Sequence, residues 1–310
     1  MSNILIIKHG SLGDLIQANG AIEDIKKSNI KSNVILLTSN QYIDFMNRCP
    51  YIDEVIVDRR LPRWNLIYLY KLKKKLSSYN FTQVFDLQNS NRTKFYSKYL
   101  INLAKWSSTE TTLELGQLKS DFDKEPVLKR MEIQLKKSGI KTKNTKKSNL
   151  NWATSNIRHI TKDYISKKYI LIFPFCSSKL ITKKWPYYSI LISKLKARYN
   201  NKYHVIVAPG PKEIEESKLL GAQVVLNKGK SLNISELISL IKDSSFVITN
   251  DTGPAHICSH MNKLGLVLFG SHTSAHKVSI ESEKFKPISV KDLKLLNAET
   301  VMEEIKKILN

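Results

Sequence analysis

The sequence predicts an α/β protein made of two Rossmann-like domains, each with a parallel sheet covered by helices. Short apolar segments with strand character alternate with longer segments of helical spacing, and this alternation is typical of parallel sheets. The pattern occurs twice, because both halves of the chain open with an Ile-Leu-Ile run, at residues 4–6 and 170–172. A chain of 310 residues is long enough for two domains of ordinary size.

The first domain is predicted over residues 1–155. Its first strand is followed by a helical pattern between Leu15 and Ile25. Residues 136–150 are rich in Lys, Ser, Thr and Asn and are expected to form a linker or an exposed loop. The strands expected in this half are residues 4–7, 34–37, 54–57 and 83–87.

The second domain is predicted over residues 156–296. Asn233 and Glu236 form a capping-box pattern that begins a helix ending near residue 243. An amphipathic helix is expected over 299–309, and one arrangement we consider packs the segment 297–310 back on the first domain. Another helix is expected over 186–199, with strands at 169–173, 203–208, 223–226, 246–248 and 264–269.

Residues 247–256, with the sequence Val-Ile-Thr-Asn-Asp-Thr-Gly-Pro-Ala-His, are the most informative stretch of the chain. An apolar strand ends in a turn, and Pro254 suits the first turn of a following helix. We expect Asp251 and Thr252 to cap the helix. A strand, a glycine turn and a helix N-terminus together can bind a phosphate group. The alternative is an ordinary capped turn between a strand and a helix.

A similar arrangement opens the chain, where a strand is followed by Lys8-His9-Gly10-Ser11-Leu12-Gly13-Asp14. The spacing Gly10-x-x-Gly13 differs from the dinucleotide and P-loop patterns, so it predicts neither NAD nor ATP binding. Asp14 stands at the start of the helix. It can serve as a partner of the helix dipole or as a carboxylate base.

The formal net charge of +23 is spread over both halves of the chain and suggests anionic partners, such as phosphorylated substrates, lipid headgroups or nucleic acid. A compositional bias toward Lys, Asn and Ile is the alternative explanation. Three scattered cysteines without CxxC spacing favour a reducing compartment over a disulfide framework or zinc site. With no signal-peptide pattern and no apolar run near the ~20 residues of a membrane span, we expect a cytoplasmic protein.

Five segments, taken in order, resemble glycosyltransferase family 9, the family of the lipopolysaccharide heptosyltransferases. They are Gly13-Asp14; Phe85-Asp-Leu-Gln88 followed by Arg92; Phe173-Pro-Phe-Cys-Ser-Ser178 with Lys183-Lys-Trp-Pro186; Val207-Ala-Pro-Gly210 followed by Glu213; and Thr249-Asn-Asp-Thr-Gly-Pro-Ala-His256 with Leu268-Phe-Gly-Ser271.

The resemblance implies the GT-B fold, with two Rossmann-like domains that face each other across a cleft. It also implies an inverting, metal-independent transfer of a heptose-like sugar from a nucleotide-diphospho-sugar such as ADP-heptose, without a further cofactor. Asp14 would be the catalytic base and Lys183 would contact the diphosphate. The donor-binding set would be Gly13, Ser178, Glu213, Asp251, Thr252, Gly253 and His256.

The acceptor implied by the resemblance is an anionic glycolipid, such as the lipopolysaccharide core, bound by the N-terminal domain. Its candidate contacts are Arg59, Arg60, Arg63, Gln88 and Arg92. Basic and aromatic residues interleave from Trp64 to Lys75, which favours a peripheral contact with the inner membrane. The alternative for this segment is an ordinary surface helix whose apolar face lies in the core.

Several features leave the function open. Residues 271–276 replace a Thr-Asp-Pro-like loop that borders the sugar site in the family, so the sugar is not identified. Asp121 and Asp123 resemble a metal-binding pair but are expected to be solvated charges, and His256 and His260 are too few ligands for a metal. A sugar-nucleotide epimerase or hydrolase and a non-catalytic nucleotide-sugar-binding protein are the alternatives. We expect no nucleic-acid binding, because no helix-turn-helix, RNP or zinc pattern is present.

Overall fold

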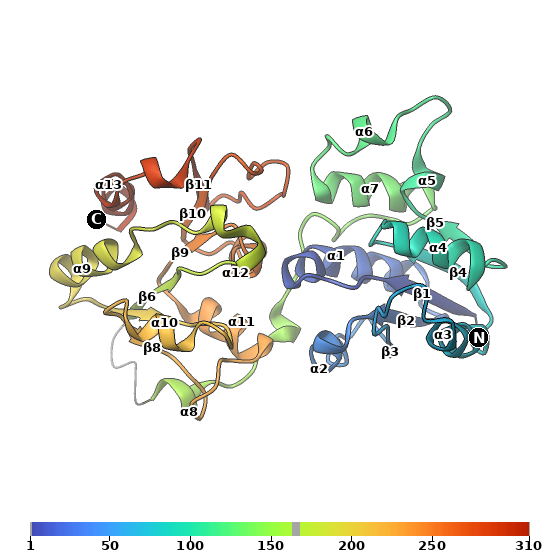
Figure 1. The fold of residues 1–310 in the computed structure, drawn as a ribbon, viewed down its shortest axis with the longest axis horizontal. Helices are drawn as coiled ribbons and strands as arrows, with labels where there is room; N and C mark the ends of the chain where they lie inside the picture. The colour runs from blue at the N-terminus through green and yellow to red at the C-terminus, as the bar shows by residue number, and fades with distance from the viewer. Residues whose placement is uncertain (1, 163–167, 310) are drawn as a thin grey trace. The chain divides into compact units, whose positions relative to one another are not determined.

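The computed structural model describes residues 2–162 and 168–309, and internal contacts divide the chain into two compact units (Figure 1). The first unit is Met1–Trp152 and the second is Ala153–Asn310. The division lies close to the predicted boundary at residue 155. Each unit contains one sheet in which all strands run parallel.

The first sheet has five strands in the order β3-β2-β1-β4-β5. Its strands are β1 Asn3–Ile7, β2 Asn33–Thr38, β3 Glu54–Val57, β4 Phe81–Asp86 and β5 Lys105–Ser107. The helices are α1 Leu12–Ser28, α2 Ile43–Met46, α3 Leu66–Ser77, α4 Asn91–Tyr99, α5 Thr109–Thr112, α6 Lys119–Phe122 and α7 Val127–Lys137, with the 3₁₀ turn η1 Asn40–Tyr42. Strand β5 was not predicted, because this short edge strand has no apolar run.

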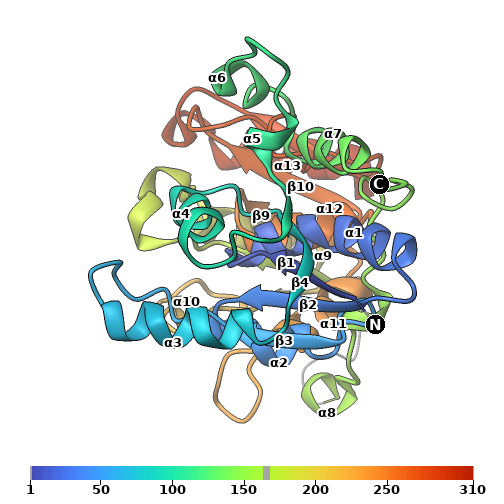
Figure 2. The same ribbon diagram turned by 90° about the vertical axis from the view of Figure 1, so that its right-hand side faces the viewer.

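Alternation of side chains along the strands builds the core of the first unit. Leu5 and Ile7 of β1 pack with Leu72 and Leu76 of α3 and with Tyr96 of α4, all of them buried. Helices α1 and α7 contact each other (Figure 2). The central strands β1 and β2 are buried along almost their whole length because both faces of a parallel sheet are covered.

The segment 136–150 does not form an exposed linker throughout. Asp24 of α1 is 1% exposed and accepts hydrogen bonds from the backbone N–H groups of Asn144 and Thr145, at 2.9 and 2.7 Å. Asn19 Nδ2 donates to Ser148 Oγ at 2.6 Å. A Cβ atom at Gly20 would lie 2.1 Å from the Asn144 carbonyl oxygen, so α1 approaches this segment closely. Polar composition concealed the packing, because the segment is held by hydrogen bonds to buried groups of α1.

The second sheet has six strands in the order β11-β10-β9-β6-β7-β8. The strands are β6 Lys168–Phe173, β7 Tyr203–Val207, β8 Gln223–Val224, β9 Phe246–Asn250, β10 Gly265–Phe269 and β11 Phe285–Ser289. The helices are α8 Arg158–Thr161, α9 Tyr188–Tyr199, α10 Ile214–Lys218, α11 Ile234–Asp243, α12 Gly253–His260 and α13 Ala298–Leu309. The 3₁₀ turns of this unit are η3 Ser178–Lys183 and η4 Leu293–Leu295, and η2 Asn151–Ala153 lies at the division between the two units. Strand β11 was missed because Lys286 and Pro287 interrupt its apolar pattern.

The terminal helix α13 packs within the second unit. Its buried residues Val301 and Ile305 share a core cluster with Leu191 and Leu195 of α9. This packing on α9 replaces the arrangement in which the terminal segment returns to the first domain. The apolar stripe of α13 was evident from the sequence, but any exposed apolar face of either domain could have received it.

Both sheets share the Rossmann strand order, in which the chain starts in the middle, extends to one side and then crosses to the other. The order reverses between β1 and β4 in the first unit and between β6 and β9 in the second. Ligands of open α/β sheets bind at the carboxyl ends of the strands at these two points. Among the described residues, no helix is both long enough and apolar enough to cross a bilayer.

Candidate active site

Polar side chains follow β1 and β4, where the strand order of the first sheet reverses. Lys8 is 4% exposed, and its Nζ atom donates to the Leu87 carbonyl oxygen at 2.9 Å. The backbone N–H of His9 donates to Gln88 Oε1 at 3.0 Å. Burial lowers the pKa of Lys8, and the carboxylates of Asp14 and Asp86 oppose that shift. The two strand ends are therefore joined by side-chain to backbone contacts.

Asp14 lies in the first turn of α1, beside this junction. Its Oδ2 atom accepts hydrogen bonds from Ser11 N at 2.8 Å and Ser11 Oγ at 3.0 Å. Its Oδ1 atom lies 3.9 Å from Lys8 Nζ, and the side chain is 42% exposed. The capping role expected of an acidic residue in this turn is thus present. Gly13 is buried in the same turn.

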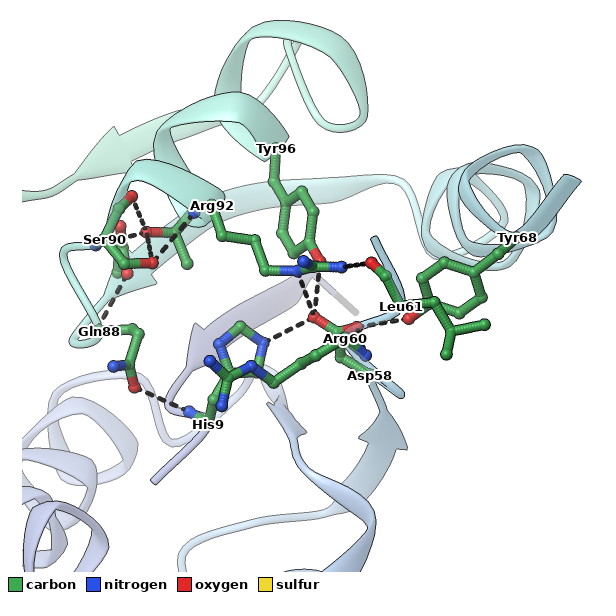
Figure 3. A network of polar contacts seen from close by, with 11 residues as sticks. His9, Asp58, Arg60, Leu61, Tyr68, Gln88, Ser90, Arg92 and Tyr96 are labelled. Atoms are coloured by element: carbon green, nitrogen blue, oxygen red, sulfur yellow. Dashed lines mark hydrogen bonds and ion pairs between the residues drawn. The ribbon is translucent and has the colours of Figure 1, made fainter. Parts of the chain in front are cut away.

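Asp58 follows β3 and is the centre of a buried polar network that the sequence analysis did not identify (Figure 3). Its side chain is fully buried, and its Oδ2 atom lies 2.8 Å from His9 Nε2. Tyr96 donates to the same oxygen at 2.6 Å, and Tyr68 donates to Oδ1. Burial raises the pKa of Asp58, but the contacts with His9, Tyr68 and Tyr96 outweigh it and hold that pKa well below its usual range.

The Asp58 network positions two of the five predicted acceptor residues. Arg60 N donates to Asp58 Oδ1 at 2.7 Å, and Arg92 Nε lies 3.7 Å from Oδ2. Arg92 also donates to Tyr96 Oη at 2.5 Å and to the Leu61 carbonyl oxygen. Figure 3 shows Gln88 beside His9, close to this network.

The other two predicted acceptor residues lie outside the network. Arg59 is exposed, and the exposed Arg63 lies over the Phe95 ring at 5.7 Å.

The second sheet has a corresponding junction where β6 and β9 end. Asn250 is fully buried, and its Nδ2 atom donates to the Pro174 carbonyl oxygen at 3.0 Å. Its Oδ1 atom accepts from Tyr188 Oη at 3.0 Å and from Trp185 N at 3.4 Å. Asn250 thereby fixes the turn that precedes α12 and the segment after η3.

Lys183, Asp251 and His272 form the charged centre of the second unit. The Asp251 side chain is 3% exposed, and its Oδ2 atom accepts a hydrogen bond from Lys183 Nζ at 2.6 Å. His272 Nε2 lies 2.9 Å from the same oxygen, and its ring stacks on Phe269. The sequence analysis placed residues 271–276 where the family has a loop that borders the sugar site, but it gave His272 no role of its own. Its position after β10, at the carboxyl edge of the sheet, is the signal that could have identified it.

Helix α12 begins at Gly253 without a side-chain cap. Thr252 is the N-cap residue but makes no side-chain cap hydrogen bond, and the Asp251 carboxylate is bound by Lys183 and His272 instead. The expectation that Asp251 and Thr252 cap this helix is therefore wrong. The positive end of the α12 dipole can accordingly interact with an anion. His256 is half-buried on the same helix.

Glu213 and Ser178 are the remaining predicted donor residues of the second unit. Glu213 Oε2 accepts a hydrogen bond from Gly210 N at 2.7 Å, and burial raises the pKa of the Glu213 carboxyl. Lys184 pairs with Glu216 and lies over the Phe175 ring at 5.4 Å. Ser178 belongs to η3, but its side chain lies outside the described residues.

A cavity of about 470 Å³ adjoins the charged centre of the second unit. It is lined by His272 and Ser271, by Thr182 of η3, by Lys291, and by Lys294 of η4. Its size suits a sugar or a nucleoside fragment, and its lining includes three lysines, Lys184, Lys291 and Lys294. Asp121 and Asp123 belong to the first unit, where they pair with Lys124, Lys119 and Arg130. No cluster of three metal-ligand side chains occurs in the described part of the chain.

Asp58→Asn should lower the unfolding free energy of the first unit by about 3–5 kcal/mol near neutral pH, because one side of a buried charge network is removed. The pKa of Asp58 is lower in the folded state, so its contribution exists above about pH 4 and is lost as the pH falls further. Hydrogen exchange of the β1 and β3 amides should therefore show a wild-type advantage that shrinks on acidification. An advantage that stays constant down to about pH 2 would contradict the network's role.

Comparison with known proteins places these features in a family. The family description "Glycosyltransferase family 9 (heptosyltransferase)" matches residues 69–307. A protein of Haemophilus influenzae described as a putative glycosyltransferase is 23% identical over 309 residues, covering 93% of this chain and 87% of that protein.

Two solved structures from Escherichia coli share the fold at 16% identity. ADP-heptose lipopolysaccharide heptosyltransferase II superposes with a TM-score of 0.75, covering 100% of this chain and 98% of that one. Heptosyltransferase WaaC with ADP superposes with a TM-score of 0.73, covering 98% and 99%. The fold is thus the two-domain GT-B fold of these enzymes, and the protein belongs to glycosyltransferase family 9, the heptosyltransferases.

Proposed function

We propose that the protein transfers a heptose-like sugar from a nucleotide-diphospho-sugar, such as ADP-heptose, to an anionic, lipid-linked acceptor of the lipopolysaccharide-core type. The observation that carries the proposal is the charged centre of the second unit. There Lys183 and the uncapped N-terminus of α12 lie beside the buried Asp251 carboxylate. Two heptosyltransferases with this fold are described with ADP or ADP-heptose, which supports the choice of donor.

The donor diphosphate would bind the second unit through Lys183 and the backbone N–H groups of Thr252 and Gly253. A diphosphate leaving group needs its developing charge neutralised, and an ammonium group with a helix N-terminus can supply this without a metal ion. Lys183 is paired with Asp251 in the structure. When Lys183 turns to the phosphate, His272 would remain as the partner of Asp251, which could then accept a hydroxyl of the sugar.

Asp14 would act as the general base for the acceptor. Its carboxylate removes the proton of the acceptor hydroxyl, the oxygen bonds to the anomeric carbon, and the bond from that carbon to the diphosphate breaks. A single displacement of this kind inverts the anomeric centre. Ser11 holds Oδ2 of the carboxylate, and the Lys8 ammonium lies near Oδ1. The Arg60 and Arg92 side chains would bind the anionic groups of the acceptor.

A panel of ADP-, GDP- and UDP-linked sugars tests the proposal. Binding is measured by titration, and transfer is measured with a lipopolysaccharide-core acceptor in the presence of EDTA. ADP-heptose should bind most tightly, and transfer should persist in the chelator with inversion of the anomeric centre. Turnover of the donor without an acceptor would favour an epimerase or hydrolase. Binding without any turnover would favour a nucleotide-sugar-binding protein, and rescue by Mg²⁺ or Mn²⁺ would exclude the metal-independent mechanism.

Lys183→Ala should weaken donor affinity and lower the transfer rate, together by roughly 10- to 150-fold, because a charge-assisted bond to phosphate is lost. Lys184→Ala is the matched control, because this neighbouring lysine pairs with Glu216 instead of Asp251. Titration with ADP and steady-state rates measure the two effects. A larger loss in the Lys184 variant would show that the wrong lysine has been assigned to the diphosphate.

Asp14→Asn should lower turnover at least ~100-fold, the scale expected for a lost general base. Donor affinity should be retained, because the asparagine oxygen can still accept the Ser11 hydrogen bond that caps α1. Ser11→Ala is the control, because it weakens the same cap and leaves the carboxylate in place. Equal losses of turnover in the two variants would assign Asp14 to helix capping alone.

A further inference from the structure

An exposed apolar cluster precedes and begins α3 in the first unit. Trp64, Leu66, Ile67 and Tyr70 are 80%, 73%, 72% and 68% exposed. Large apolar side chains are often exposed one at a time, but four within seven residues form a patch of the kind that marks an interaction site. We call these four residues, together with the lysines of α3, the α3 surface.

The geometry of α3 explains why these side chains face outward. Asn65 caps the helix by accepting the Tyr68 N–H at 3.0 Å. Leu69, Leu72 and Leu76 are buried and attach the helix to the sheet. At 100° per residue, Leu66, Ile67 and Tyr70 project on the side away from that buried stripe, over the first two turns. The alternative of a surface helix with its apolar face in the core accounts for Leu69, Leu72 and Leu76, but it leaves the exposed apolar side chains unexplained.

Positive charge surrounds the apolar cluster without any compensating negative charge in the sequence nearby. From Arg59 to Phe85 the chain contains seven basic residues and no acidic residue. Within the described part of the chain, the four lysines of α3 form no ion pair, whereas Lys94 of α4 pairs with Glu110. These lysines, Lys71, Lys73, Lys74 and Lys75, are all exposed.

We propose that the α3 surface docks on an anionic lipid bilayer, with the apolar cluster inserted among the headgroups and the lysines bound to lipid phosphates. Apolar residues gather at the start of the helix and lysines at its end, which is the division of roles expected of an interfacial helix. Lysine side chains are long enough to reach phosphates while the apolar side chains insert. A protein partner would require complementary acidic pockets in fixed positions, whereas a lipid surface presents a continuous layer of negative charge.

The docking surface is connected to the proposed acceptor residues. Tyr68, on the third position of α3, donates to Asp58, and Asp58 also binds Arg60 N and lies beside Arg92. A bilayer contact at α3 would thus place the membrane near the residues proposed to bind a lipid-linked acceptor. This link rests on the proposed function, whereas the docking itself can be measured without donor or acceptor.

Cosedimentation with lipid vesicles tests the docking. The wild-type protein should bind vesicles of phosphatidylcholine with about one third phosphatidylglycerol, and bind far less to phosphatidylcholine alone. Binding should weaken as salt is raised, because exposed charges are screened beyond about 8 Å at physiological ionic strength. Failure of the wild-type protein to bind the anionic vesicles at low salt would overturn the proposal.

Charge-reversal variants test whether vesicle binding depends on the lysines of α3 or on the net charge of the whole protein. Replacing Lys73, Lys74 and Lys75 by glutamate should weaken vesicle binding by at least about 100-fold, because each lysine near an anionic surface contributes roughly a fivefold factor and each glutamate adds repulsion. The matched control replaces the exposed residues Lys228, Lys230 and Lys242 of the second unit by glutamate, with the same change in net charge. Equal losses in the two triple variants would show that the charge acts diffusely and would overturn the proposed surface.

Apolar variants test the insertion. Leu66→Ser with Ile67→Ser should weaken vesicle binding at least ~10-fold at raised salt, where the apolar contribution remains. Ile30→Ser with Leu219→Ser is the control, since both side chains are exposed outside α3. If the Leu66 and Ile67 variant changes self-association and leaves vesicle binding intact, the surface contacts a second copy of the chain and the proposal is overturned.

Trp64 provides a direct probe of depth, because it is the most exposed of the four tryptophans. Brominated lipids should quench its fluorescence on binding, and Trp64→Phe should abolish most of the quenching while vesicle binding persists. Unchanged quenching in Trp64→Phe would exclude insertion at α3. ADP titration of each variant verifies that the second unit is intact. A protein that binds vesicles but does not transfer sugar would contradict the proposed function alone.

Discussion

A parallel sheet whose two faces are covered by helices can present polar side chains to a ligand only where its strands end. The strands at the centre of both sheets are apolar because helices cover both sides, and the strand order reverses once in each sheet. Lys8 and Gln88 follow β1 and β4, and Pro174 and Asn250 lie where β6 and β9 end. The other candidate site residues also follow strand ends: Asp14 and Arg92 lie in the first turns of α1 and α4, Asp58 follows β3, and Asp251 and His272 follow β9 and β10. The order and direction of the strands therefore determine which positions of the chain can carry catalytic residues.

Each unit uses one buried carboxylate to organise its basic side chains. A carboxylate removed from water costs several kcal/mol unless it is paired and hydrogen-bonded. Asp58 meets that requirement with His9 and two tyrosine hydroxyls, and Asp251 meets it with Lys183 and His272. The two cases differ in their partners. The partners of Asp58 include neutral hydroxyls that hold it in one arrangement, whereas Asp251 binds a lysine that a phosphate could attract, with a second partner on the same oxygen.

At α3, part of the chain's positive charge lies beside exposed apolar side chains. Some surface lysines elsewhere pair with a nearby acid, as Lys306 and Lys307 do with Glu303 and Glu304 on α13. Such exposed pairs stabilise a fold by at most about 1 kcal/mol each. On α3 the lysines have no such partners among the described residues and stand beside exposed apolar side chains. Composition alone could not separate a general bias toward lysine from a surface of this kind, because both give the same net charge.

The sequence by itself determined the strands with strong apolar runs, the helix starts at Asn233 and Pro254, and the ordered motifs that indicate the family, because these are local patterns of spacing and residue type. It did not reveal β5 or β11, whose edge positions do not require an apolar run. Tertiary structure alone decided that α13 packs on α9 and that the segment after residue 140 is held by Asp24. It also decided that Asp58 belongs to the candidate site of the first unit and His272 to that of the second. Contacts of this kind depend on which distant strand ends and helices become neighbours, and no local pattern encodes that proximity.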